Sequence, residues 1–136
     1  EAGDRAVDLL YGDGPLADRV ARVLAWGKPG AVRGGQGARK IGLTGAAVSY
    51  LLAMSDPARY AFCKPQIYKS AASVLLGEEH VEKDEARRIA HCTQFYGEAL
   101  ELFRRESRLE RFTDLMHCHV AFYVMDHYPN HPRDMT

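Results

Sequence analysis

Apolar residues recur three and four positions apart along most of the chain, which is the spacing of one face of an α-helix. The clearest example is the set that follows the glycine-rich turn before Pro15, namely Leu16, Val20, Val23 and Leu24. No stretch of useful length alternates apolar and polar residues as a half-buried β-strand does. The pattern therefore predicts an all-α fold of five to seven helices.

Capping residues divide this pattern into separate helices. Thr44 is a suitable N-cap for a helix over residues 45–54, whose buried face would hold Val48, Leu51 and Leu52. Because small residues fill the rest of this segment, a neighbouring backbone could approach it closely.

A second capping signal lies further along, where Pro65 is expected to begin a helix and Gly77 to follow its last residue. Longer helices are expected over about 81–105 and 108–127, the first with a kink or tight contact at Gly97. The inward residues of the helix after Pro65 would be Ile67, Tyr68, Ala71, Val74 and Leu75.

The length of 136 residues predicts one helical domain over residues 1–136. Residues 27–37 hold five glycines and a proline in eleven positions, so a flexible loop is expected at about 27–38. No run of about 18 apolar residues is present, which excludes a membrane span. Three widely separated cysteines favour reduced thiols in the cytoplasm. Since the chain begins without Met, we expect it to be a piece of, or a partner in, a larger protein.

A net charge of zero argues against a general binder of polyanions. The charge is unevenly spread, however, because every charged residue between positions 19 and 40 is basic. This basic segment is either an electrostatic footprint for an anionic partner or a solvated helix face with a loop. Its members are Arg19, Arg22, Lys28, Arg33, Arg39 and Lys40.

The turn Lys40-Ile41-Gly42-Leu43-Thr44-Gly45 resembles the helix-hairpin-helix element of DNA-repair proteins, in which backbone amides meet a phosphate. The wider segment is similar to the second half of the helix-hairpin-helix DNA glycosylases. This chain departs from that family at two places. Thr44 replaces the second hairpin glycine, and Phe62-Cys63-Lys64 stands where the catalytic aspartate belongs. The resemblance therefore implies a phosphate contact without base excision.

We accordingly expect a nucleic-acid contact at the hairpin-like turn, with support from two lysines of the following segment. A glycosylase or lyase that uses Lys40 or Lys64 as an amine is the catalytic alternative, and no catalytic residue is assigned. The expected DNA-binding residues are Arg39, Lys40, Gly42, Thr44, Gly45, Lys64 and Lys69.

A broader resemblance covers roughly residues 8–125, through segments such as Leu10-Tyr11-Gly12, Ser49-Tyr50-Leu51-Leu52 and Pro57-Ala58-Arg59-Tyr60. These look like a helical module attached to restriction and defence ATPases, the McrB type of GTPase among them. The resemblance implies a non-catalytic accessory module for DNA or another subunit. No GxxxxGK[ST] loop is present, so no nucleotide hydrolysis and no cofactor are expected.

Two further interpretations remain open at this point. A protein-interaction or homodimerisation module would expose an apolar patch, for which Tyr60, Phe62, Phe122 and Tyr123 are the candidates. A metal site could be assembled from His91, Cys92 and Cys118, although no ligand pair has the usual spacing on one helix. Buried thiols and surface histidines account for these residues better, so no metal is expected.

Overall fold

The computed structural model describes residues 2–27, 43–106 and 111–127, which form six α-helices and no strand. This confirms the predicted all-α domain of five to seven helices. Most of the loop predicted at about 27–38 lies outside the described residues. The elements are α1 (Ala2–Tyr11), α2 (Leu16–Trp26), α3 (Gly45–Ser55), α4 (Pro65–Leu76), the 3₁₀ turn η1 (Glu78–His80), α5 (Glu85–Glu106) and α6 (Leu115–His127).

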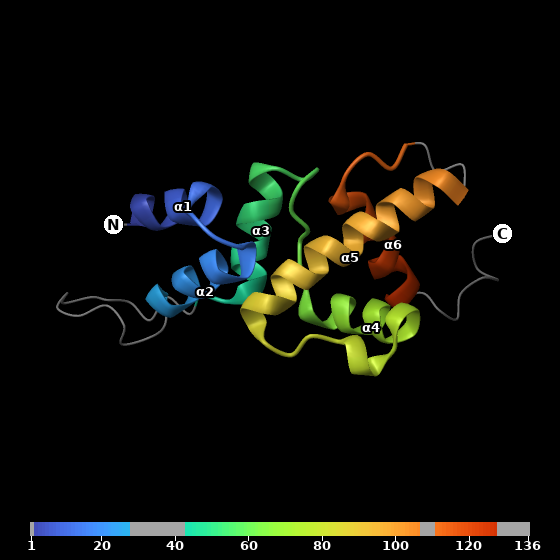
Figure 1. The fold of residues 1–136 in the computed structure, drawn as a ribbon. Helices are drawn as coiled ribbons and strands as arrows, with labels where there is room; N and C mark the ends of the chain where they lie inside the picture. Colours follow the sequence, from blue (N-terminus) through green and yellow to red (C-terminus); the bar gives the residue numbers. More distant parts are fainter. Residues whose placement is uncertain (1, 28–42, 107–110, 128–136) are drawn as a thin grey trace.

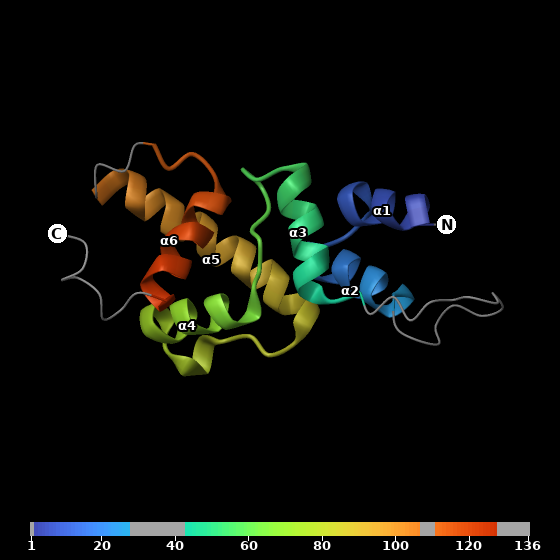
Figure 2. The ribbon, with the colours of Figure 1, turned by 180° about the vertical axis from the view of Figure 1, so that it is seen from behind.

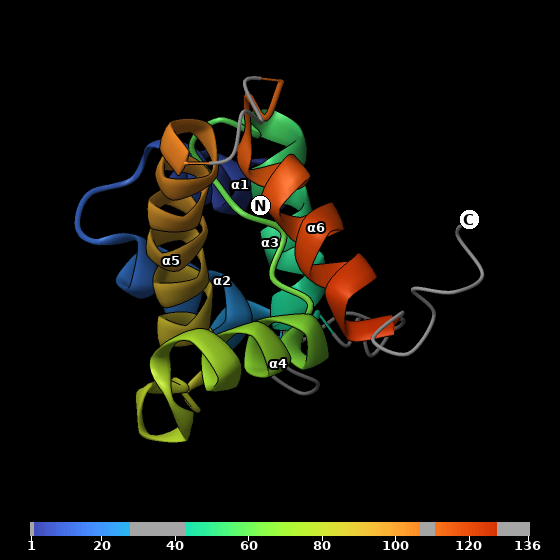
Figure 3. The same cartoon turned by 90° about the vertical axis from the view of Figure 1, so that its right-hand side faces the viewer.

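The long helix α5 is the axis of the fold. It packs against α2 and α3 near its beginning and against α6 further along. Figure 1 shows α1, α2 and α3 on one side of the molecule and α4 and α6 on the other, and the reverse view agrees (Figure 2). Seen from the end, α5 and α6 lie side by side, and α4 crosses below them (Figure 3). The described helices thus form one compact domain.

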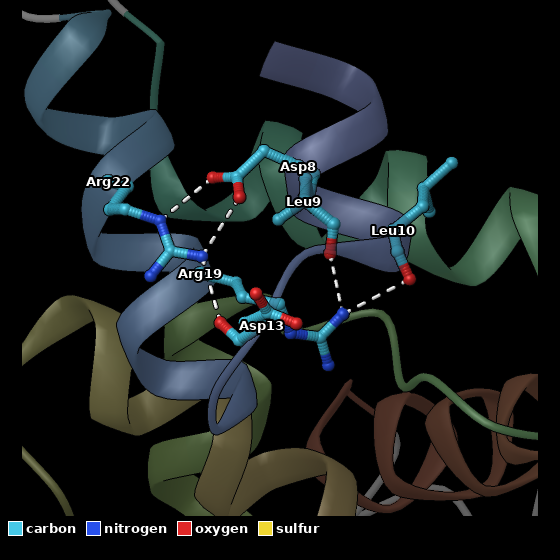
Figure 4. Close-up of polar contacts among 6 residues, drawn as sticks. All are labelled: Asp8, Leu9, Leu10, Asp13, Arg19 and Arg22. Atoms are coloured by element: carbon cyan, nitrogen blue, oxygen red, sulfur yellow. Dashed lines mark hydrogen bonds and ion pairs between the residues drawn. The ribbon is translucent and has the colours of Figure 1, made fainter. Parts of the chain in front are cut away.

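An arginine-rich contact joins α1 to α2 (Figure 4). Arg19 is only 7% exposed, and its Nη1 donates to the carbonyl oxygens of Leu9 and Leu10 at 2.8 and 3.1 Å. These carbonyls belong to the last turn of α1, which the helix itself leaves unbonded. Arg22 grips the carboxylate of Asp8 with two hydrogen bonds of 2.8 and 2.9 Å, which lowers the pKa of that carboxyl.

The segment over residues 56–64 runs through the middle of the molecule, between its two halves (Figure 1). Its backbone cannot use a helical ladder, so side chains of the helices satisfy it. The Ser49 hydroxyl of α3 accepts from the amide of Cys63 at 2.9 Å, and Thr93 of α5 accepts from the amide of Ala61 at 3.2 Å. This segment therefore fixes the point at which α4 begins.

The hydrophobic core lies around the first two thirds of α5 and continues under α4 and α6. Stacked and tilted aromatic rings, among them Phe95, Tyr96 and Phe122, fill its centre. The largest fully buried side chains are Tyr68, Tyr96, Phe122, Leu52, Ile67, Ile89, Val20 and Val48. No helix of the described part has both the length and the apolar composition needed to cross a membrane.

Three apolar residues expected inside the molecule lie on its surface. Leu51 is 57% exposed, Val74 is 76% exposed and Leu75 is 52% exposed. Both α3 and α4 carry apolar residues on more than one face, so periodicity alone could not select the buried face. The faces that point inward carry Val48 and Leu52 on α3, and Ile67, Tyr68 and Ala72 on α4.

The last two helices begin later than predicted, because an aspartate caps each of them. The carboxylate of Asp84 accepts from the amide of Arg87 at 3.0 Å, just before α5, and that of Asp114 accepts from the amide of His117 at 3.1 Å, just before α6. The helix continues through Gly97, where an added Cβ would meet nothing within 4 Å, so the tight contact predicted there is wrong.

Candidate functional site

The N-terminus of α3 is closed by side chains of the protein itself. The Thr44 hydroxyl accepts from the amide of Ala47 at 3.2 Å, as the predicted N-cap should. Gly45 is buried, and its amide donates to Oε1 of Glu85 at 2.5 Å. A Cβ on Gly45 would lie 2.6 Å from Cγ of Glu85, so a larger residue here would push this side chain away from the amide. An anion from outside could reach the Gly45 amide only by displacing Glu85.

The N-terminus of α4, in contrast, is open. Its N-cap residue, Lys64, makes no side-chain capping hydrogen bond, and Pro65 occupies the first turn. Lys64, Pro65 and Gln66 are all exposed. The Nζ of Lys64 lies 5.7 Å from the ring centroid of Tyr123, a cation–π contact that leaves its charge unneutralised. Lys69, five residues further along the chain, is also exposed.

The beginnings of three helices meet at this place. Gly45 of α3, Pro65 of α4 and Glu85 of α5 line one small cavity of about 10 Å³, together with Arg88. Because helix N-termini carry partial positive charge, their convergence creates a positive potential, which the Glu85 carboxylate partly neutralises. The sequence-predicted residues Thr44, Gly45 and Lys64 are thus brought together, and Glu85 is the neighbour that sequence reasoning did not connect with them.

A larger, open cavity of about 620 Å³ lies on the adjoining face of α4. Figure 1 shows how η1 and the chain after it return beneath α4 to the start of α5. Lys69 and Lys83 have no ion-pair partner among the residues that the structure describes. The cavity is lined by Pro65, Gln66, Tyr68, Lys69, Ser73, Glu78, Val81, Glu82, Lys83 and Arg88.

Hydrogen bonds hold the inner wall of this cavity in place. The buried hydroxyl of Tyr68 accepts from the amide of Glu82 at 3.0 Å and is also hydrogen-bonded to Nδ1 of His91. Burial raises the pKa of Tyr68, so the hydroxyl stays protonated. Arg88 donates to the backbone carbonyls of Glu82 and Lys83 at 3.3 and 2.8 Å. The Arg88 guanidinium thus holds the loop at residues 82–83 and forms no ion pair with a carboxylate among the described residues.

Of the basic residues between positions 19 and 40, Arg19 and Arg22 lie in α2, and the others lie outside the described residues. Arg19 and Arg22 bind the carbonyls and the carboxylate of α1, so they belong to the fold and not to an electrostatic footprint (Figure 4). Arg39, Lys40 and Gly42, for which a phosphate contact is predicted, lie outside the described residues.

The three cysteines are buried and free, and the thiols of Cys92 and Cys118 are poor nucleophiles. Burial raises the pKa of Cys118 to about 12, and burial beside Cys63 raises that of Cys92 well above its ordinary value. No group of three His, Cys, Asp or Glu side chains within the described residues is placed to hold a metal ion. His91 is bonded to Tyr68, so the proposed set of His91, Cys92 and Cys118 is not assembled.

The predicted exposed apolar patch is wrong for Tyr60 and Phe122, and the other two residues, Phe62 and Tyr123, are half-buried. Tyr60 is 4% exposed and Phe122 is 2% exposed, because both pack in the core. Exposed apolar side chains gather elsewhere, on α4 and α6, where a shallow cavity of about 200 Å³ lies between the helices. We call this the α4–α6 surface, defined by Val74, Leu75 and Met125, which are 76%, 52% and 56% exposed.

Comparison with known proteins identifies no relative: the chain matches no family model, no curated protein and no solved structure.

Proposed function

We propose that this chain is a non-catalytic, nucleic-acid-binding helical module that contacts the phosphate backbone through the N-terminus of α4. The observation that carries the proposal is the pair Lys64 and Lys69, exposed beside an uncapped helix N-terminus. Two exposed ammonium groups and a positive helix end form a fitting contact for a phosphodiester backbone.

The geometry of the neighbouring helices supports this choice of contact. At α3 the Gly45 amide is already bonded to Glu85, whereas no carboxylate closes the start of α4. Arg88 lies next to Pro65 and adds positive potential, which Glu85 in the same small cavity partly offsets. In this proposal Lys64 and Lys69 contact separate phosphates of the backbone, while Thr44 and Gly45 shape the adjoining surface. Arg39, Lys40 and Gly42 would extend the contact, as the hairpin-like turn implies.

The module would serve a larger assembly, in line with its resemblance to the accessory helical modules of restriction and defence ATPases. It would deliver the nucleic acid, and the partner would supply the chemistry. Lys64 is flanked by Tyr123 and His119 rather than by a carboxylate, an environment that suits binding better than covalent catalysis.

Fluorescence anisotropy with labelled duplex DNA at salt concentrations between about 50 and 200 mM tests the proposal. We expect the affinity to fall steeply with salt. Lys64→Ala and Lys69→Ala should each weaken binding and reduce the slope of log K against log salt by about 1. Arg104→Ala, at the far end of α5, is the matched control and should change neither quantity. Salt-independent binding, or an equal loss in the control, would rule the proposal out.

A second candidate function, protein interaction, is favoured by the α4–α6 surface. Three strongly exposed apolar side chains on two packed helices are typical of a contact surface. If this surface mediates self-association, sedimentation velocity should show a rising mean mass with concentration, and Val74→Glu should abolish that rise. The same variant should leave DNA binding unchanged, because Val74 lies away from the start of α4.

A further inference from the structure

We infer that the open cavity beneath α4 holds a single unpaired nucleotide, with its base inside and its phosphate at the rim. This inference rests on the proposed function and names the kind of nucleic acid that the module would recognise. The cavity volume of about 620 Å³ lies within the range that accommodates small ligands, and it exceeds what one nucleotide needs.

Both cationic and anionic side chains line the cavity, so a ligand with one anionic end and one hydrogen-bond-donating end would fit it best. Lys69 and Lys83 line the cavity and have no carboxylate partner in the described part of the chain, so an anionic group could pair with either ammonium. Glu78 and Glu82 line the same cavity and can only accept hydrogen bonds when ionised. A fitting ligand is therefore anionic at one end and donates N–H groups at the other.

A nucleotide whose base carries an amino group has this combination. The amino groups of adenine, cytosine and guanine donate hydrogen bonds, and the side-chain amide of Gln66 can both donate and accept. Inorganic phosphate lacks the N–H donors, and an acyl chain lacks both features. Thymine has no amino group, so it should fit less well.

The wall of the cavity is held in place by hydrogen bonds, so its acceptor groups keep fixed positions. Its inner wall is fixed, since the Tyr68 hydroxyl is bonded to Glu82 and His91. The Glu82 carboxylate accepts from the amides of Lys83 and Asp84 at 3.1 and 3.2 Å, which holds the loop rim. An amino group that donates to Glu78 or Glu82 lies on the pairing edge of the base, so that edge must be free and the nucleotide unpaired.

The test compares a duplex carrying one unpaired adenine with the same duplex fully paired, by fluorescence anisotropy at one salt concentration. We expect the wild-type chain to bind the first about tenfold more tightly, the gain of one well-made set of base contacts. Ser73→Phe fills the cavity from α4 without changing the charge, and should remove this preference while leaving salt-dependent binding to the paired duplex. Ser70→Phe, on the same helix but facing the α4–α6 surface, should keep the preference.

Equal affinities for the two duplexes in the wild-type chain would overturn this inference and leave the proposed function standing. Absence of binding to either duplex would instead remove the proposed function. Loss of the preference in Ser70→Phe as well would also overturn the inference, because the effect would not come from the cavity.

Titration with adenosine 5′-monophosphate, followed by amide NMR shifts, separates a free nucleotide from a nucleotide in a strand. Shifts confined to Gln66, Ser73 and Lys83, together with the preference for the unpaired duplex, support the cavity as the site for both. Shifts at these residues without that preference would make the free nucleotide the ligand and overturn the strand-bound form proposed.

Discussion

The N-termini of α3 and α4 lie side by side, yet the first is capped by side chains and the second is not. At α3, the Thr44 hydroxyl caps the first turn, and the Glu85 carboxylate bonds to the amide of Gly45. At α4, the N-cap is Lys64, which caps nothing, and the first turn is exposed. One helix end is thus satisfied by the protein, whereas the other presents its positive potential to the solvent.

This difference shows that a local sequence signal alone is insufficient to locate an anion-binding site. The glycine turn before α3 has the sequence that favours a phosphate contact, but a carboxylate from α5, 40 residues away in the chain, occupies its amide. The plainer Lys-Pro start of α4 has no such neighbour closing it. Whether a helix end can bind a ligand therefore depends on which side chains the tertiary fold brings to it.

The largest expected effect comes from the bond that ties the two helix ends together. Ser49 is fully buried, and its hydroxyl accepts from the amide of Cys63, directly before Lys64. Ser49→Ala leaves that buried amide unsatisfied, so the free energy of unfolding should fall by about 2 kcal/mol. Urea denaturation measures this change.

The control for this prediction is Ser55→Ala, on the same helix. The Ser55 hydroxyl donates only to the carbonyl of Leu52 within its own helix, and its side chain is exposed. We expect a loss below about 0.5 kcal/mol, as for most surface substitutions. Equal losses in the two variants would mean that the Ser49–Cys63 bond does not hold the helix ends together.

The next effect should make α3 resemble α4. Glu85→Ala removes the carboxylate from the Gly45 amide, which should lower the free energy of unfolding by about 1.5 kcal/mol, the contribution of a charge-assisted hydrogen bond. Because a negative charge disappears beside the proposed contact, DNA affinity should rise in the same variant. Glu101→Ala, an exposed carboxylate further along α5, is the control. Unchanged affinity in Glu85→Ala would show that no phosphate approaches this place.

Sequence alone was sufficient for the helices whose ends carry strong local signals. Thr44 was correctly identified as the N-cap of α3, and Pro65 and Gly77 bound α4 as predicted, with Gly77 at φ +99°, a conformation that suits glycine. These signals act within a few residues of the helix end, so no tertiary information was needed. The capping aspartates Asp84 and Asp114 carry the same kind of local signal at the starts of α5 and α6.

The buried faces and the candidate site depended on contacts between distant residues. Leu51 and Val74 occupy apolar segments with more than one apolar face, so only the packed structure shows that they face the solvent. Arg19 and Arg22 looked like part of a basic footprint because their partners, in α1, are not adjacent in sequence. The bond from Gly45 to Glu85 leaves no periodic trace, so the sequence could not reveal it.

Removing the N-cap of α3 and adding one to α4 should change the free energy of unfolding in opposite directions. Thr44→Ala removes the cap of α3 and should cost about 1 kcal/mol of unfolding free energy. Lys64→Asp gives α4 a cap and a favourable charge for the helix dipole, so it should add about 0.5 kcal/mol while weakening DNA binding. Lys69→Asp, which cannot cap, should weaken binding without that gain. Destabilisation by Lys64→Asp would show that the start of α4 is already satisfied.

The smallest effect concerns His119, which lies beside the open end of α4 and is 8% exposed. Burial lowers the pKa of His119, and the charge of Lys64 lowers it further. Since the folded state then binds a proton less readily than the unfolded state, stability should fall as the pH drops through the ordinary histidine pKa of about 6.5, and level off below the folded pKa. Lys64→Ala should raise the pKa of His119, as followed by NMR titration of its ring protons, whereas Lys69→Ala should not. If the pKa of His119 is the same in the wild type, Lys64→Ala and Lys69→Ala, the Lys64 charge does not act on His119. The open end of α4 would then lose Lys64 as one of the two cations, with Lys69, that distinguish it from the start of α3.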